Sequence, residues 1–171
     1  MKWFGLAARL VVGGVWIVAG ALKLPDPAAS VRAVRAYDLL PESIVPTVGH
    51  LLPVLEVVLG LCLVLGALTR LAGVVSALLF VAFIIGIASV WSRGIRIECG
   101  CFGGGGYDEN ATSAYPWEIA RDVGLLLLSA YLVWRPRTAL SADAWIFPDS
   151  ATPTTPTTPS TPGSTTERLE A

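Results

Sequence analysis

Four long apolar runs dominate the chain, and segments rich in proline, glycine and charge separate them. The runs cover residues 5–24, 51–68, 72–91 and 116–134. Each comes close to the roughly 20 apolar residues that a helix needs to cross the hydrocarbon core of a bilayer. A segment in lipid must satisfy its backbone hydrogen bonds internally, so we expect every run to be an α-helix. The pattern predicts an all-α integral membrane protein, a four-helix transmembrane bundle.

The end of the chain has a different pattern. From residue 148 onward serine, threonine and proline recur in a near-repeat, Thr-Pro-Thr-Thr-Pro-Thr-Thr-Pro. With almost no apolar side chains to bury, such a segment cannot offset the entropy that ordering would cost. We therefore divide the chain into a transmembrane domain, residues 1–137, and a Thr/Pro-rich tail, residues 138–171, which we expect to be disordered.

The first apolar run has two interpretations. Lys2 precedes it and Ala19-Gly20-Ala21 resembles a cleavage site, which is typical of a signal peptide. The run is longer than a usual signal core and three further spans follow it, so we favour a retained helix. Its glycines Gly13, Gly14 and Gly20 would allow close contact with another helix.

The segment between the first two runs is more polar. Pro25-Asp26-Pro27 ends the first helix, and residues 28–40 have apolar positions in helical register with arginines off that face. This pattern predicts an amphipathic helix on the membrane surface or folded over the bundle. The histidine His50 stands alone before an apolar run, and we interpret it as an interfacial residue rather than a ligand. Residues 69–71 form a very short connection, which makes the second and third spans an antiparallel pair.

The composition agrees with a membrane protein and excludes other classes. Of 171 residues, 54% are hydrophobic and 15% are charged, whereas soluble domains carry about 25% charged residues. The mean hydropathy is +0.65. The net charge of −1 gives no basic patch for nucleic acid. The expected partner of most of the surface is the lipid bilayer.

Charged residues within the spans are candidates for function, because a charge in lipid is costly unless it is paired, neutralised or hydrated. Glu56 lies inside the second run, and we expect it to face the bundle interior and pair with a cation. Lys23 is the first candidate, although a lysine at a helix end can also extend to the interface. Arg121 is the alternative. Arg121 and Asp122 are neighbours in the chain and point in different directions on a helix, so they need not pair with each other.

A cysteine pair stands in the longest polar gap, in Glu98-Cys99-Gly100-Cys101-Phe102-Gly103. Gly100 permits the bend that would bring Cys99 and Cys101 together. Such a pair suits thiol–disulfide exchange, a plain disulfide that closes the loop, or a soft metal ion. The nearby Arg93 and Arg96 would favour the reactive thiolate. Cys62 lies within an apolar run and is interpreted as a small buried hydrophobe.

Five short motifs are specific enough to suggest a family: Leu22-Lys23-Leu24-Pro25-Asp26, Tyr37-Asp38-Leu39-Leu40-Pro41, Leu52-Pro53-Val54-Leu55-Glu56, Cys99-Gly100-Cys101-Phe102-Gly103 and Trp117-Glu118-Ile119-Ala120-Arg121-Asp122. Together they resemble the MauE proteins of methylamine utilisation, which are related to the DoxX and DoxD-like membrane proteins. The resemblance covers about residues 1–137.

The resemblance implies a four-helix membrane protein with a role in disulfide chemistry or in the maturation of exported proteins, often beside a thioredoxin-like partner. It marks Cys99 and Cys101 as the catalytic pair. The supporting residues that it suggests are Lys23, Glu56, Arg121 and Asp122, and Arg93 joins them because it precedes the cysteine loop. A bundle with a thiol pair near one membrane face also resembles vitamin K epoxide reductases, although those enzymes have Cys-x-x-Cys where this chain has Cys-x-Cys.

Two functions from different classes follow. In the first, the protein is a membrane thiol–disulfide oxidoreductase that exchanges disulfides with a thioredoxin-like protein or a secreted client, with a membrane quinone as electron acceptor. In the alternative, it is a non-catalytic assembly or metal-binding subunit that uses the pair as a clip. A complete zinc site from this chain is not expected, because zinc prefers four ligands and His50 is the only imidazole.

The orientation in the membrane does not follow from charge. Lysines and arginines near the spans are equally numerous on the two sides, so the positive-inside rule does not decide between them. Disulfide exchange favours an oxidising compartment. We therefore expect a multi-pass protein of the cell membrane with the cysteine loop on the extracytoplasmic side.

Overall fold

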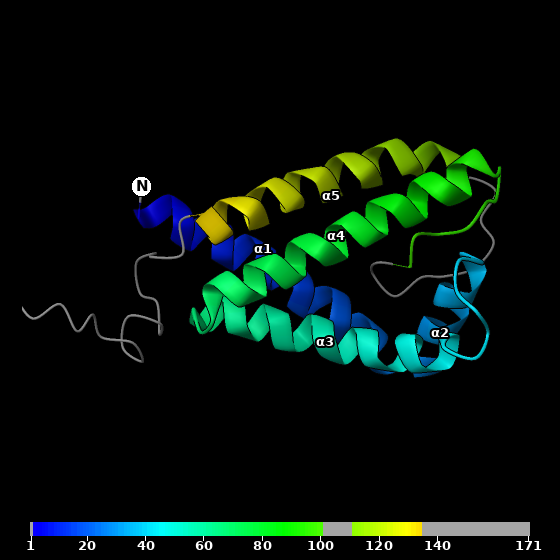
Figure 1. Ribbon diagram of the computed structural model, residues 1–171, viewed down its shortest axis with the longest axis horizontal. Helices are drawn as coiled ribbons and strands as arrows, with labels where there is room; N and C mark the ends of the chain where they lie inside the picture. The colour runs from blue at the N-terminus through cyan, green and yellow to red at the C-terminus, as the bar shows by residue number, and fades with distance from the viewer. Residues whose placement is uncertain (1, 101–110, 135–171) are drawn as a thin grey trace, which may run out of the picture.

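The computed structural model describes residues 2–100 and 111–134, and most of these residues lie in α-helices (Figure 1). The all-α class predicted from the apolar runs is confirmed. The predicted tail and most of the cysteine loop, including Cys101, lie outside the described residues. The helices are α1 (Lys2–Lys23), α2 (Pro27–Ala36), α3 (Val45–Leu65), α4 (Thr69–Ser92) and α5 (Ala111–Trp134).

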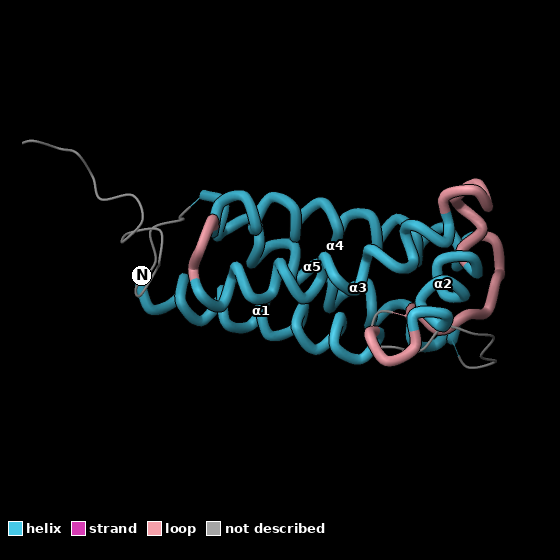
Figure 2. The backbone as a smooth tube through the Cα atoms, turned by 90° about the horizontal axis from the view of Figure 1, so that it is seen from below, coloured by secondary structure: helices cyan, strands magenta, loops and turns pink. Residues whose placement is uncertain are grey.

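The four long helices run alongside one another, and the short α2 lies at one end of them (Figures 1 and 2). Helix α1 packs mainly on α3, and α4 packs mainly on α5. Contacts of α1 with α5 and of α3 with α4 join the two pairs into one bundle. Helix α2 packs on α3, so it covers the end of the bundle where α1 finishes and α3 begins.

Prolines made two helix starts hard to place from the sequence. The second run was predicted to begin at residue 51, but α3 begins at Val45, with Pro46 in its first turn. A first-turn proline costs nothing there, since its missing N–H would have no partner within the helix. Similarly, α5 begins at Ala111 rather than 116, and Pro116 lies inside it.

Positive φ angles explain two other corrections. The amphipathic helix was predicted over 28–40, but α2 ends at Ala36, and Asp38 adopts a φ of 49° that no right-handed helix continues. The connection between the second and third spans lies at 66–68 rather than 69–71. Gly66 (φ 71°) caps α3 and Leu68 (φ 51°) precedes α4, so the chain reverses over three residues.

In the described part of the chain, three helices are long and apolar enough to cross a membrane: Trp3–Lys23, Val45–Leu65 and Thr69–Ser92. Helix α5 is as long as α4, at 24 residues, but Glu118, Arg121 and Asp122 make it more polar. It packs along α4 and α1. The predicted membrane character is therefore confirmed for three of the four spans, and the crossing by α5 stays a prediction.

The bundle interior combines aromatic packing with close backbone contact. Trp16 of α1 stacks on Phe80 of α4 at 4.6 Å between ring centroids, and its indole N–H donates to the Ser76 hydroxyl at 3.0 Å. Gly13 and Gly60 bring α1 and α3 together, because a Cβ at either position would lie within 3.0 Å of the other residue's carbonyl oxygen. The same expectation for Gly14 was wrong, since nothing lies within 4 Å of a Cβ there.

A buried arginine joins α1 to the end of α3. The Arg9 Nε donates to the Leu63 carbonyl oxygen at 2.8 Å, and Nη2 donates to that of Val64 at 3.0 Å. The last carbonyl groups of a helix have no partner within the helix. Arg9 supplies a donor to two of them from a neighbouring helix, and the Leu63 carbonyl oxygen also accepts from the Gly66 amide at 3.1 Å. Gly66 makes room for the guanidinium, because a Cβ at that position would lie 2.2 Å from Arg9 Nη2.

Candidate functional site

The predicted intramembrane ion pair is present between the end of α1 and the middle of α3. Lys23 Nζ lies 2.6 Å from Glu56 Oε1, and both side chains are buried, Glu56 completely. The Lys23 ammonium also lies 5.8 Å from the ring centroid of Phe83 on α4. The other carboxylate oxygen, Glu56 Oε2, has no hydrogen-bond partner among the described residues. The pair is therefore neutral overall but keeps an acceptor open.

A second ion pair lies within α5, between neighbours for which the sequence left pairing open. Arg121 and Asp122 do pair with each other: Arg121 Nε and Nη2 lie 3.0 and 2.9 Å from Asp122 Oδ1. The arginine side chain is long enough to fold back to its neighbour, which the directions of the Cα–Cβ bonds alone did not suggest. Asp122 is buried, and its Oδ2 has no hydrogen-bond partner within the described part of the chain.

The two ion pairs meet at a small cavity in the bundle core. Glu56, Arg121 and Asp122 line it together with aromatic and small side chains, and its volume is about 10 Å³. A space of roughly 10–15 Å³ holds one water molecule when polar groups surround it. A single water there would have two open carboxylate oxygens to donate to. The core thus contains a charged cluster, formed by Lys23 of α1, Glu56 of α3, and Arg121 and Asp122 of α5.

The cysteine segment is anchored by a tyrosine from each side. The Tyr37 hydroxyl, at the end of α2, donates to the Cys99 carbonyl oxygen at 2.6 Å. The Tyr115 hydroxyl of α5 accepts from the Ile97 amide at 3.0 Å and lies 2.9 Å from the carbonyl oxygens of Ile95 and Ile97. Burial raises the pKa of Tyr37 above its ordinary value, which keeps its hydroxyl protonated as a donor.

The two cysteines that the structure describes differ in their states. Cys99 is buried and disulfide-bonded, and it packs with Ile87, Val90 and Tyr115. Cys62 is a free thiol on α3, partly buried beside the bundle core. Cys101, the second member of the predicted pair, lies outside the described residues.

Arg93 supports the site differently from the way the sequence suggested. Its guanidinium donates to the carbonyl oxygens of Tyr37 and, at 3.5 Å, of Asp38. These contacts tie the end of α4 to the end of α2, so Arg93 positions the tyrosine that holds Cys99. Arg96, the other arginine expected near the thiols, is exposed.

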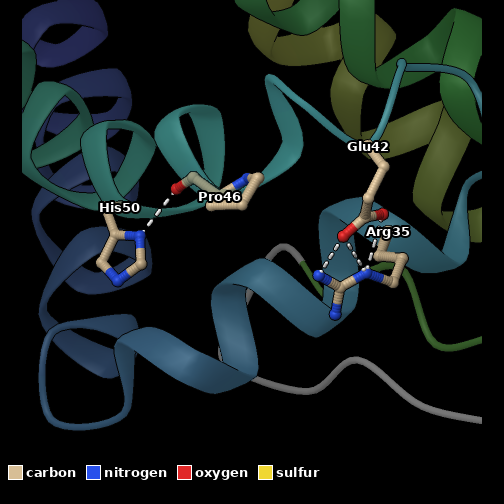
Figure 3. Close-up of polar contacts among 4 residues, drawn as sticks. All are labelled: Arg35, Glu42, Pro46 and His50. Carbon is tan, nitrogen blue, oxygen red and sulfur yellow. Dashed lines mark hydrogen bonds and ion pairs between the residues drawn. The ribbon is translucent and has the colours of Figure 1, made fainter.

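Helix α2 is held in place by polar contacts at its surface. Asp26 caps its start by accepting from the Ala29 amide at 3.0 Å. At its end, Arg35 reaches both carboxylate oxygens of Glu42 in the α2–α3 connection, with Nε at 2.9 and 3.0 Å (Figure 3). In the first turns of α3, His50 Nδ1 lies 2.6 Å from the Pro46 carbonyl oxygen, so this nitrogen carries the proton (Figure 3). His50 is exposed, as an interfacial residue would be.

A pocket of about 280 Å³ lies beneath α2 and brings the predicted site residues together. Lys23 and Cys99 both line it, along with Ser30 and Tyr37 of the α2 segment and Phe83 of α4. The remaining lining is apolar. The cation of the ion pair and the cysteine thus border one space, although they are far apart in the sequence.

Sequence reasoning missed Tyr37, Tyr115 and Ser30. Tyr37 lies within one of the motifs that suggested the family, so that motif was the available signal. Tyr115 and Ser30 gave none, because an isolated tyrosine or serine beside a helix is common in any chain. Within residues 2–100 and 111–134, no three His, Cys, Asp or Glu side chains are grouped to hold a metal ion.

Fold and site together define a multi-pass helical membrane protein that carries a buried charged cluster and a disulfide-bonded cysteine at one end of its bundle. Comparison with protein families places it further: the chain belongs to the MauE family, described as methylamine utilisation protein MauE, whose model matches residues 1–135. No match was found among curated proteins or among solved structures.

Proposed function

We propose that this protein is a membrane thiol–disulfide oxidoreductase that acts in the maturation of exported proteins, in the setting of methylamine utilisation that its family indicates. Cys99 and Cys101 would be its redox pair. The observation that carries the proposal is the position of Cys99, a disulfide-bonded residue that borders a pocket together with Lys23, the cation of the Lys23–Glu56 ion pair.

The proposed exchange proceeds through a mixed disulfide. A thiolate of a thioredoxin-like partner or an exported client attacks one sulfur of the Cys99–Cys101 disulfide and releases the other as a thiolate. The second thiol of the partner then attacks the mixed disulfide, which leaves an oxidised partner and two reduced cysteines here. The exchange favours an oxidising compartment, so the cysteine segment would lie on the extracytoplasmic face of the cell membrane.

Alkylation with a mass tag tests the proposal in native membranes. We expect both loop thiols to be tagged only after reduction, and Cys62→Ser to leave that pattern unchanged, since Cys62 is already a free thiol. Cys99→Ser should expose Cys101 without reductant and trap mixed disulfides with a partner. If both loop thiols are tagged fully under all conditions, the alternative of a non-catalytic assembly or metal-binding subunit replaces the proposal.

Reporter fusions test the orientation separately. A reporter that is active only outside the cytoplasm, inserted after Gly106, should be active, and the same reporter at the C-terminus should be inactive. The reverse pattern would place the cysteines in the cytoplasm and contradict the proposed location in an oxidising compartment.

A further inference from the structure

The pocket beneath α2 has the composition of a site for a lipid-soluble molecule with polar oxygens. Almost all of its lining is apolar, including Phe83 and the leucines Leu39 and Leu40. Leu39 and Leu40 are 48% and 39% exposed, so the pocket wall continues onto an apolar outer surface of the protein. A ligand would therefore reach it from the bilayer rather than from water.

Two polar side chains interrupt the apolar lining. One is Lys23, whose ammonium group uses one contact for Glu56 Oε1 and has further N–H donors. The other is Ser30 of α2, which is 6% exposed and whose hydroxyl has no hydrogen-bond partner among the described residues. Buried hydroxyl groups are normally hydrogen-bonded. An unpaired one in a pocket wall indicates that the occupant supplies an acceptor.

These features restrict the class of ligand. An anionic headgroup or phosphate would lose its hydration on entering an apolar space with one already neutralised cation. A plain acyl chain would leave the Ser30 hydroxyl unpaired. A molecule with a flat apolar ring, carbonyl oxygens and an apolar tail satisfies both Ser30 and Lys23 and matches the lining.

We propose that this pocket binds a membrane quinone, which reoxidises the cysteine pair. The inference rests on the proposed redox function and names its electron acceptor. Cys99 borders the same pocket as Lys23 and Ser30, so the quinone ring and the redox-active sulfur would occupy one space.

The reaction is balanced without any further reagent. The two thiols of reduced Cys99 and Cys101 lose two electrons and two protons and form one S–S bond. The quinone takes up those two electrons and two protons and becomes the quinol. Lys23 and Ser30 donate hydrogen bonds to carbonyl oxygens of the quinone, where negative charge develops as it is reduced.

Binding of decylubiquinone to the full-length oxidised protein in nanodiscs tests the site apart from turnover. We expect Ser30→Ala to raise the Kd about three- to tenfold, the range of one neutral hydrogen bond. Ala82→Phe places a ring where the exposed Ala82 of α4 lines the pocket, and should raise the Kd about tenfold or more, since the ligand space is filled.

A matched control variant shows whether a phenylalanine acts by filling the pocket or by disturbing its helix. Ala130 of α5 is likewise exposed, but it lines a different groove between α4 and α5. Ala130→Phe should leave the Kd unchanged. Equal effects of the two phenylalanine variants, or a Kd insensitive to Ser30→Ala, would overturn the assignment of the pocket.

A second probe distinguishes a quinone site from an acyl-chain slot. Decylbenzene carries the same apolar tail but no carbonyl oxygen, so it should compete at least about tenfold more weakly than decylubiquinone. Equal competition would show an acyl-chain slot and refute the quinone site.

The experiments give different results if the quinone site is wrong and if the proposed exchange function is wrong. If the loop thiols cycle with a partner but decylubiquinone neither binds in the pocket nor is reduced by the dithiol protein, the quinone site is wrong and the exchange function stands. If decylubiquinone binds as expected but the thiols never cycle, the exchange function is wrong and the site stands.

Discussion

Helix α1 carries two buried cations, Arg9 near its start and Lys23 at its end, and their contacts with α3 differ in kind. Arg9 donates to two carbonyl oxygens at the end of α3, and these acceptors are neutral backbone groups. Lys23 faces the carboxylate of Glu56 and also lines a pocket. A cation that satisfies helix ends serves the fold. A buried ion pair often adds no more stability than apolar side chains would, so we expect Lys23 and Glu56 to serve the pocket rather than the fold.

Breaking the Lys23–Glu56 pair should have the largest effect on stability. Lys23→Met leaves the Glu56 carboxylate buried without its cation, which costs about 3–5 kcal/mol in comparable pairs. We expect a marked fall in the thermal unfolding midpoint in detergent.

The double variant sharpens the test. Lys23→Met combined with Glu56→Leu removes both charges and should recover most of the lost stability, because apolar replacements of a buried pair are often neutral. Quinol formation should not recover with it. Arg32→Gln, which removes only an exposed ion pair with Asp26, serves as the control. A double variant with full redox activity would show that the pair is structural.

Removing Arg9 should have the next largest effect, and only on the fold. Arg9→Met leaves the Leu63 and Val64 carbonyl groups without their charged donor, which costs about 1.5–3 kcal/mol for a hydrogen bond to a charged group. The thermal midpoint should fall, while thiol cycling per folded molecule stays at the wild-type level. A loss of cycling in the folded fraction would contradict the separation between the two ends of α1.

Gly66→Ala tests the same end of α1 from the other side. The substitution meets both a left-handed backbone and the Arg9 guanidinium. It should destabilise the wild type more than it destabilises the Arg9→Met background.

Tyr37→Phe should have a smaller effect that is confined to the cysteine end. It removes the hydrogen bond to the Cys99 carbonyl oxygen, which is worth about 0.5–1.5 kcal/mol. We expect faster alkylation of the reduced cysteines and little change at the Arg9 end, measured by hydrogen exchange of the α3–α4 connection. Tyr131→Phe on α5, away from the pocket, is the control. Unchanged alkylation in Tyr37→Phe would show that the hydroxyl does not hold the segment.

The smallest effect concerns the exposed Arg35–Glu42 pair. The hydrogen bond from Arg35 lowers the pKa of Glu42 below its ordinary value of 4.5. The stability that the pair contributes is therefore present above pH 4.5 and is lost as the pH falls through the lowered pKa. Glu42→Gln should have nearly the wild-type midpoint at pH 7 and a slightly smaller fall towards acid pH. A large midpoint change at pH 7 would mean that the pair is more than a surface contact.

Contacts were predictable from the sequence where leaving a group without a partner would cost the most free energy. A glutamate inside an apolar run demands a partner, so Lys23–Glu56 was foreseen. The predictions were least accurate where two local conformations have nearly the same free energy, as at the starts of helices. Pro46 could end one helix or begin another, and α3 starts with it.

Contacts set by the tertiary arrangement were not foreseeable from the sequence. Nothing local indicates that Tyr37 would reach Cys99, 62 positions away, or that Arg93 would hold Tyr37 rather than a thiolate. Residues that are adjacent in the sequence can be equally hard to predict. Arg121 and Asp122 are neighbours, yet their pairing depends on the arginine rotamer and not on sequence spacing.

The pairing of the buried cations also bears on how the chain enters a membrane. Chains emerge from the ribosome with the N-terminal part first. Arg9 and Lys23 find their partners in α3, and Arg121 finds Asp122 within α5. The Lys23–Glu56 ion pair and the contacts of Arg9 with the end of α3 are therefore made between the first two long helices. These contacts can form as α1 and α3 enter the lipid, before any residue of α4 has been synthesised.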